Sequence, residues 1–413
     1  MNRIILIGNG FDKAHNLQTG YEDFINWYWD EWEKRLFNCN GIIAEDEFIS
    51  YRLTIRDCMY GWSNVIFHNI KNYDGTKRML LNWANTNEYK CRKEYKSKLF
   101  KEICETWKCK NKNWFDIEEI YYQLLNKETQ EIEKLNDDLN LIKIKLSEYL
   151  SIIEKEISTD IIKDGIFHKL YEPIKKRDIA ISSEDLWKNE IRCRMNYSSE
   201  RWGKLISSYV NDPTQMASIH ADIMSFIKHC RSIDKEFFDY QKAPESFFLP
   251  NYTLLLDFNY TSTINLYLLK SDNVLLNQIH GELSNQDAMI FGYGDELDEK
   301  YKVLQNKKDN EYLKYIKSIK YLETSNYRRL LGFIESDAYQ VYIMGHSCGN
   351  SDRTLLNKLF EHNNCVSIKP FYYIKADGSN NYLDLVQNIS RNFTDMSLMR
   401  DRVVNKTFCE TLS

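Results

Sequence analysis

The chain opens with a short apolar run that stops at a glycine turn, and this junction constrains the fold more than any other stretch. Residues 4–7 are Ile-Ile-Leu-Ile, and Gly8-Asn9-Gly10 follows at once. Such a run, bounded by turn residues, is typical of a strand buried on both faces of a parallel sheet. From Asp12 through Phe24 to Trp29, apolar and aromatic residues recur at helical spacing. The sequence therefore predicts a strand, a tight turn and a helix.

The glycine turn suits an anion, because glycines let a ligand approach the backbone and a helix N-terminus offers unpaired N–H groups. The common dinucleotide fingerprint is incomplete, since Lys13 stands at its third glycine position. Two interpretations remain open for Gly8 and Gly10: a phosphate site, and a sharp turn without a ligand.

Composition bounds the class of protein. A chain of 413 residues is long enough for two domains. Its net charge of −5, with both signs mixed along the chain, predicts neither a nucleic-acid partner nor a membrane surface. No signal peptide is expected before the opening strand, and no apolar run approaches the ~18 residues of a membrane span. We expect a cytoplasmic protein with a small or neutral partner.

The ten cysteines are scattered rather than densely spaced. The one close pair, Cys104 and Cys109, has no second pair to complete a zinc site, so no metal is predicted.

Residues 31–250 look almost wholly helical, because glycine and proline are scarce there. We expect this region to be an insertion into a discontinuous domain made of residues 1–30 and 251–413. Within it, Asp116 is expected to cap a helix. A coiled-coil-like helix is predicted near 130–156, where apolar residues step by three and four. Its seam comprises Ile132, Leu135, Leu139, Ile142, Leu146, Tyr149 and Ile153. We favour an arm that packs on its own domain over the seam of a homo-oligomer.

After Pro250 the chain reads as short strands that each end in a polar residue or a glycine. The predicted strands are 253–258, 274–279, 289–295, 340–344 and 366–374. Pro370, inside the last one, suggests a sheet edge. The fold class is therefore α/β, with a Rossmann-type parallel sheet and a large helical insertion.

In a parallel sheet, residues that follow the strands converge on one edge, where ligands bind. Gly8–Gly10, Asn259, His280 and Gly345 should therefore be neighbours. The Asn259 carboxamide could orient a ribose hydroxyl or a water, and the His280 imidazole could deprotonate it. Cleavage of a nicotinamide–ribose bond needs little more, because the leaving group is already a cation. The alternatives are a structural histidine and an asparagine that only makes a turn.

A second reading rests on Gly345-His346-Ser347-Cys348-Gly349, which matches the Gly-x-Ser-x-Gly elbow of α/β-hydrolases. Ser347 would be the nucleophile, and His362 is the one histidine left to follow it as a base.

Several blocks together resemble the AbiH family of bacteriophage abortive-infection proteins. They are residues 7–12, 16–24, 256–261, 279–281, 291–295 and 344–347, with 114–118 as a further match in the middle of the chain. That family in turn looks related to sirtuin-like domains. The resemblance implies that Asn259 and His280 are catalytic. It also implies a cofactor-binding set of Gly8, Asn9, Gly10, Phe11, Asp12, Gly281, Gly345 and Ser347, in which the first block holds phosphates and the last two residues meet the adenosine ribose.

Two departures from the sirtuin pattern bear on activity. The zinc ribbon is missing, which argues against a protein deacylase. Asn9 replaces a small residue and Asp12 a Ser or Thr, so a related nucleotide could replace NAD, or catalysis could be lost.

The resemblance implies an antiphage effector that hydrolyses NAD to nicotinamide and ADP-ribose, with a phage-derived trigger protein and a homo-oligomer as expected partners. The alternative is a non-enzymatic module that senses a nucleotide or binds a partner.

Overall fold

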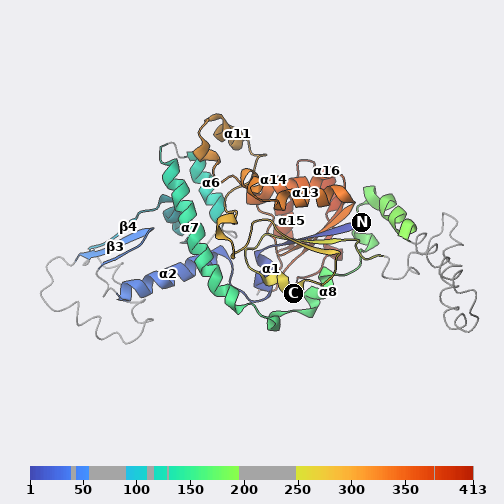
Figure 1. The fold of residues 1–413 in the computed structure, drawn as a ribbon, viewed down its shortest axis with the longest axis horizontal. Coiled ribbons are helices and arrows are strands. Elements are labelled where there is room, and N and C mark those ends of the chain that lie inside the picture. The colour runs from blue at the N-terminus through green and yellow to red at the C-terminus, as the bar shows by residue number, and fades with distance from the viewer. Residues whose placement is uncertain are drawn as a thin grey trace, which may run out of the picture.

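The computed structural model describes residues 1–38, 43–54, 90–108, 116–127, 130–194, 248–375 and 377–412 (Figure 1). Within them, no helix is both long and apolar enough to cross a membrane.

A five-stranded parallel sheet forms the centre of the molecule. Its strands are β1 (Asn2–Ile7), β5 (Thr253–Asp257), β6 (Val274–Gln278), β7 (Tyr339–Met344) and β8 (Cys365–Phe371). The spatial order is β6-β5-β1-β7-β8, and every neighbouring pair is parallel. This is the order of a doubly wound sheet, whose direction of winding reverses between β1 and β7. The predicted α/β class with a parallel sheet is confirmed.

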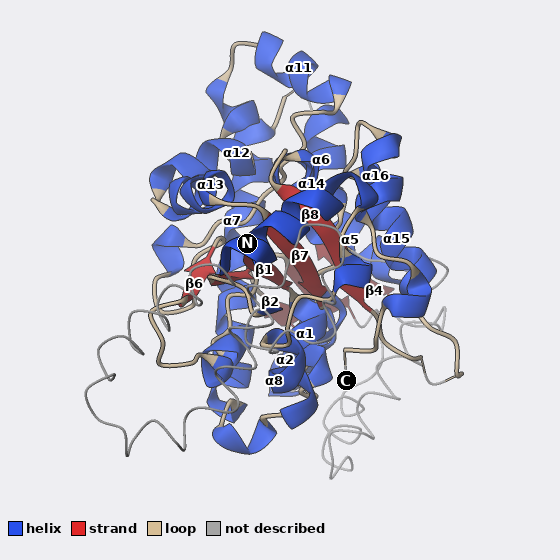
Figure 2. Ribbon diagram, turned by 90° about the vertical axis from the view of Figure 1, so that its right-hand side faces the viewer, coloured by secondary structure: helices blue, strands red, loops and turns tan. Residues whose placement is uncertain are grey.

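Helices cover both faces of this sheet (Figures 1 and 2). On one face lie α13 (Asn326–Ser336), α14 (Arg353–Glu361), α15 (Tyr382–Arg391) and α16 (Met396–Arg402), and on the other lie α1 (Asn9–Ala14) and α8 (Asp164–Leu170). Successive β1 side chains point alternately to the two helix layers, because side chains along a strand alternate between the faces of the sheet. Ile4 and Leu6 pack in the core of the first face, and Ile5 and Ile7 in that of the second.

The helical region is built around one long helix, α7 (Ile132–Ile153). It contacts α2 (Tyr21–Asn38), α5 (Lys98–Lys108) and α6 (Ile117–Lys127). All seven residues of the predicted seam are buried, and they share a core with these helices. The interpretation of the seam as an arm that packs on its own domain is therefore confirmed. The same core includes Phe291 and Tyr293, so the helical region and the sheet region are joined by apolar packing.

The prediction that residues 31–250 are wholly helical is wrong. β2 (Ile43–Glu45), β3 (Ile49–Thr54) and β4 (Lys90–Tyr95) form a small antiparallel sheet. Scarce glycine and proline favour helices and strands alike, so this signal could not separate the two. The single helix predicted from Asp12 to Trp29 is also two helices, which are separated by a turn where Asn16 adopts a φ of 63°.

The expected strand at 289–295 is an irregular, buried segment. Its backbone amides form hydrogen bonds with residues that belong to no strand. Ile290 N–H donates to the His280 carbonyl, and Tyr293 N–H donates to the Tyr315 carbonyl. Two short helices follow it, α11 (Glu299–Asn306) and α12 (Lys317–Lys320). The edge position predicted from Pro370 is confirmed, because β8 is the outermost strand.

The seam of α7 should carry much of the stability of the helical region. Leu139→Ala removes a fully buried side chain and should lower the free energy of unfolding by about 2–5 kcal/mol, measured by urea denaturation. Ile144→Ala on the same helix, at a position 38% exposed, is the matched control and should cost well under half as much. Equal effects would show that the seam is not the packing face.

Candidate functional site

Main-chain hydrogen bonds join the ends of neighbouring strands at the carboxyl edge of the sheet. Phe258 N–H donates to the Ile7 carbonyl, and Ile279 N–H donates to the Asp257 carbonyl, each over 2.9 Å. Beyond β7, Gly345 bridges to Ile7. The segments that follow β1, β5, β6 and β7 therefore lie side by side, as the sequence predicts.

The glycines of the first turn are packed against the end of β7. A Cβ on Gly8 would lie 2.5 Å from the His346 Cα, and one on Gly345, where φ is 83°, would lie 2.0 Å from the Phe11 nitrogen. The amides predicted to hold phosphates already donate to main-chain carbonyls: Gly8 to Met344, Gly10 to Gly345 and Phe11 to Gly8. A phosphate would have to break these bonds, so the sharp-turn interpretation fits Gly8 and Gly10 better.

Two buried acids lie beside this turn. The Asp12 carboxylate accepts a 2.7 Å hydrogen bond from the Thr261 hydroxyl, and that of Asp257 accepts one of 3.0 Å from the Asn259 amide. Burial raises the pKa of both carboxyls. Asp12 is thus held inside the protein, and so is Phe11, whose ring packs on Tyr267.

Asn259 lies half-buried directly after β5. Asp257 fixes its backbone, whereas its carboxamide makes no hydrogen bond to the residues that the structure describes. The neighbouring Asn9 side chain, in contrast, donates to the Thr19 hydroxyl over 2.6 Å. The Asn259 carboxamide is therefore free to meet a ligand.

His280 lies after β6 and is only 5% exposed. Its Nε2 is 3.2 Å from Asp352 Oδ1 and 3.2 Å from the Tyr321 hydroxyl. The Phe258 ring packs edge-on against its imidazole at 5.2 Å. Gly281, the next residue, adopts a φ of 83° and packs against the Ala288 carbonyl.

Asp352 belongs to a larger buried charge cluster. Its Oδ1 lies 2.8 Å from Lys317 Nζ, which also lies 2.9 Å from Glu118 Oε2. His346 Nε2 approaches Asp352 Oδ2 at 3.6 Å. We call Glu118, Lys317, Asp352, His280 and His346 the charge cluster. Glu118 comes from α6 of the helical region, so the cluster joins that region to the sheet edge.

Burial and pairing set the charges of the cluster. Burial lowers the pKa of His280, with Lys317 adding to it, against the opposing pull of Asp352. Burial opposes ionisation of Asp352, but Lys317 and His280 outweigh it and hold its pKa well below its usual range. Burial raises the pKa of Glu118 to about 8, despite Lys317. At neutral pH the cluster therefore offers a neutral imidazole beside an ionised carboxylate.

Sequence reasoning missed most of this cluster. Glu118 belongs to the block 114–118, which resembles the AbiH family, but the sequence indicates no role for it. Asp116, two residues earlier, caps α6 as predicted, since its Oδ1 accepts a 2.9 Å bond from the Glu118 amide. Lys317 carries no local signal, because its two partners, Asp352 and Glu118, are 35 and 199 residues away along the chain.

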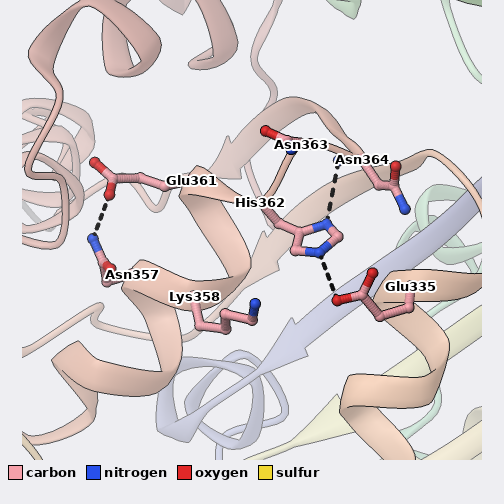
Figure 3. Close-up of a pocket in the computed structure, with 7 residues that line it drawn as sticks. All are labelled: Glu335, Asn357, Lys358, Glu361, His362, Asn363 and Asn364. Atoms are coloured by element: carbon pink, nitrogen blue, oxygen red, sulfur yellow. Dashed lines mark hydrogen bonds and ion pairs between the residues drawn. The ribbon is translucent and has the colours of Figure 1, made fainter.

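The hydrolase interpretation is contradicted by the positions of its residues. Ser347 is exposed just after β7, at the carboxyl edge, whereas His362 precedes β8 and lies at the opposite edge. A six-residue strand spans about 20 Å, so the two side chains cannot pair. Figure 3 shows His362 engaged elsewhere: its Nε2 lies 3.1 Å from Glu335, and its Nδ1 accepts from the Asn364 amide.

His362, Glu335 and Asn364 line a polar cavity of about 500 Å³ between α13 and α14 (Figure 3). Apart from His362, the candidate base of the hydrolase reading, it contains none of the predicted site residues. Among the residues that the structure describes, no group of three His, Cys, Asp or Glu side chains is arranged to hold a metal ion.

The fold and the strand-end residues define the chain as a Rossmann-type α/β protein with a polar site at the carboxyl edge of its sheet. A family model described as "Bacteriophage abortive infection AbiH" matches residues 4–373. The chain belongs to the AbiH family, which assigns it a role in abortive infection against bacteriophages. Neither the curated proteins nor the solved structures gave a significant match.

The contact between the two glycine turns should be intolerant of any side chain. Gly345→Ala would place a methyl group against the Phe11 backbone at a positive φ, so we expect a loss of more than about 2 kcal/mol in unfolding free energy. Gly378→Ala is the control, because it has the same kind of φ but open space around it. It should cost only about 1 kcal/mol, and equal losses would contradict the packing argument.

Proposed function

We propose that this AbiH protein hydrolyses NAD to nicotinamide and ADP-ribose during abortive infection, with Asn259 and His280 as its catalytic residues. The observation that carries the proposal is the placement of a neutral imidazole and an unbonded carboxamide after adjacent strands, β6 and β5, on the ligand-binding edge of the sheet.

The chemistry requires few groups. Nicotinamide leaves as a neutral molecule from a cationic ring, so no acid is needed to protonate it. A neutral His280 can take a proton from the attacking water or a ribose hydroxyl, and Asn259 can both donate to and accept from that hydroxyl. A positioned general base contributes about 10²–10⁴-fold to such a step.

The burial of His280 bears on regulation. With 5% of the residue exposed, NAD can reach the imidazole only after neighbouring segments move. This suits a cytoplasmic effector that stays quiet until a phage-derived trigger protein or assembly into a homo-oligomer opens the site. Ser347 and Gly345 would then meet the adenosine end of the nucleotide.

The same burial favours a second candidate function, in which the protein senses NAD or a related nucleotide without turning it over. In that case binding, rather than hydrolysis, would drive the helical region to signal.

The first test measures nicotinamide release from NAD by the purified protein, with and without phage lysate. His280→Ala and Asn259→Ala should each lower the rate by about 100-fold. His362→Ala, a histidine at the opposite edge of the sheet, is the matched control and should retain full activity. Activity that survives in both site variants would refute the assignment. Tight NAD binding without turnover under all conditions would favour the sensing function.

The pH profile gives a second test. Burial lowers the pKa of His280 below its ordinary value of 6.5, so the imidazole stays unprotonated, and competent as a base, throughout the neutral range. We expect the acid-side fall of kcat/KM for NAD to be centred below pH 6.5. A fall centred above pH 6.5 would contradict this protonation state.

A further inference from the structure

Lys317 is the centre of the charge cluster, and its position is unusual for a lysine. It is 1% exposed, and its ammonium lies between Glu118 Oε2 and Asp352 Oδ1 at 2.9 and 2.8 Å. A buried ion costs several kcal/mol unless its partners are well placed. The ammonium is therefore held where it can keep Asp352 ionised.

The ionised state of Asp352 fixes the hydrogen of His280. A carboxylate can only accept, so Asp352 Oδ1, at 3.2 Å from His280 Nε2, favours the tautomer with the hydrogen on Nε2, in which the Tyr321 hydroxyl at 3.2 Å from the same nitrogen is also an acceptor. This leaves Nδ1 as the proton acceptor of the neutral ring. The second oxygen of Asp352 faces His346, whose Nδ1 accepts from the Cys348 amide and whose hydrogen therefore lies on Nε2. Donors thus face both oxygens of Asp352.

We infer that Asp352 and Lys317 are positioning residues for His280: Lys317 keeps Asp352 a carboxylate, and Asp352 holds the tautomer in which Nδ1 is the base. Glu118 extends this arrangement to the helical region, because it lies on α6. Its other oxygen, Oε1, accepts a 2.9 Å hydrogen bond from the Gly292 backbone amide. The tautomer and its dependence on Lys317 stand by themselves. Only their consequence for catalysis rests on the proposed function.

The titratable groups around His280 come from several elements. The charged or ionisable ones that face it or the charge cluster are Tyr21 of α2, Asp116 and Glu118 at α6, Tyr260 after β5, Lys317 of α12, Tyr321, His346 after β7 and Asp352 before α14. Of these, Lys317 is the cation that lowers the pKa of His280 most, and Asp352 is the anion that opposes it most.

The test measures the tautomer and the pKa of His280 by NMR of the full chain labelled with 15N-histidine. The signal is assigned by its loss in His280→Ala. The wild type should show one tautomer, protonated at Nε2. Asp352→Asn should give a mixture of tautomers and a lower pKa, because the opposing anion is gone. Lys317→Met should give the same mixture of tautomers, because without the ammonium Asp352 is no longer held as a carboxylate.

Lys369→Met is the matched control. Lys369 is also fully buried between two carboxylates, Glu172 and Asp178 at 3.2 and 3.1 Å. It lies on β8, four strand spacings or about 19 Å from β6. Its loss should destabilise the fold to a similar degree without moving the His280 signals. If Lys317→Met does not fold, Lys317→Met combined with Glu118→Gln removes the ammonium together with the ionisable group of Glu118, and it should give the same mixture of tautomers.

Signals of His280 that are the same in the Asp352 and Lys317 variants as in the Lys369 control would overturn the inference. So would a single tautomer protonated at Nε2 that persists in Lys317→Met, because Asp352 would then stay a carboxylate without the ammonium. In turnover, Asp352→Asn should lower kcat for NAD hydrolysis by about 100-fold with little change in KM. A wild-type protein that does not hydrolyse NAD would refute the proposed function alone, since the NMR result decides the positioning role without any turnover.

Discussion

The buried ion pairs of Lys317 are the interaction on which the arrangement of the site depends. An ammonium taken out of water is tolerated only while the groups that accept its hydrogen bonds, Glu118 and Asp352, stay in place. One of them, Glu118, begins helix α6, and the other, Asp352, begins the helix that follows β7. Removing α6 from the sheet would therefore leave the buried ammonium of Lys317 with Asp352 as its remaining partner in the charge cluster. The helical region is bound to the site by charge as well as by the apolar core that it shares with Phe291.

The backbone contact between Gly8 and the end of β7 decides from which side a ligand can approach. It fills the point where the winding of the sheet reverses, which is the usual place for a nucleotide. The carboxyls of Asp12 and Asp257 beside it also disfavour a phosphate whenever they are ionised. For the proposed hydrolysis of NAD, both arguments favour the β5–β6 side, where Asn259 and His280 lie, for the ribose and the nicotinamide, and another part of the edge for the phosphates.

The sequence predicts the parts of this structure that depend on local patterns. The apolar runs locate four of the strands after the helical region, Pro370 indicates the edge strand, and the three-four spacing gives the seam of α7. Segment 289–295 looks like a strand because it is buried, but its backbone bonds to partners scattered over the chain. The small antiparallel sheet was missed although β3 alternates apolar and polar residues, because β2 has three residues and β4 is strongly charged.

The site shows the same division. His280 could be singled out because it follows an apolar run, and position along a strand is a local property. Its protonation state could not be predicted, since it depends on Lys317 and Asp352, which meet it only in the folded chain. The electrostatic surroundings of His280 are therefore a product of tertiary structure, since Lys317 and Asp352 reach it from different elements. Because Glu118 of α6 pairs with the same Lys317, a partner that displaced the helical region would change the charges around His280.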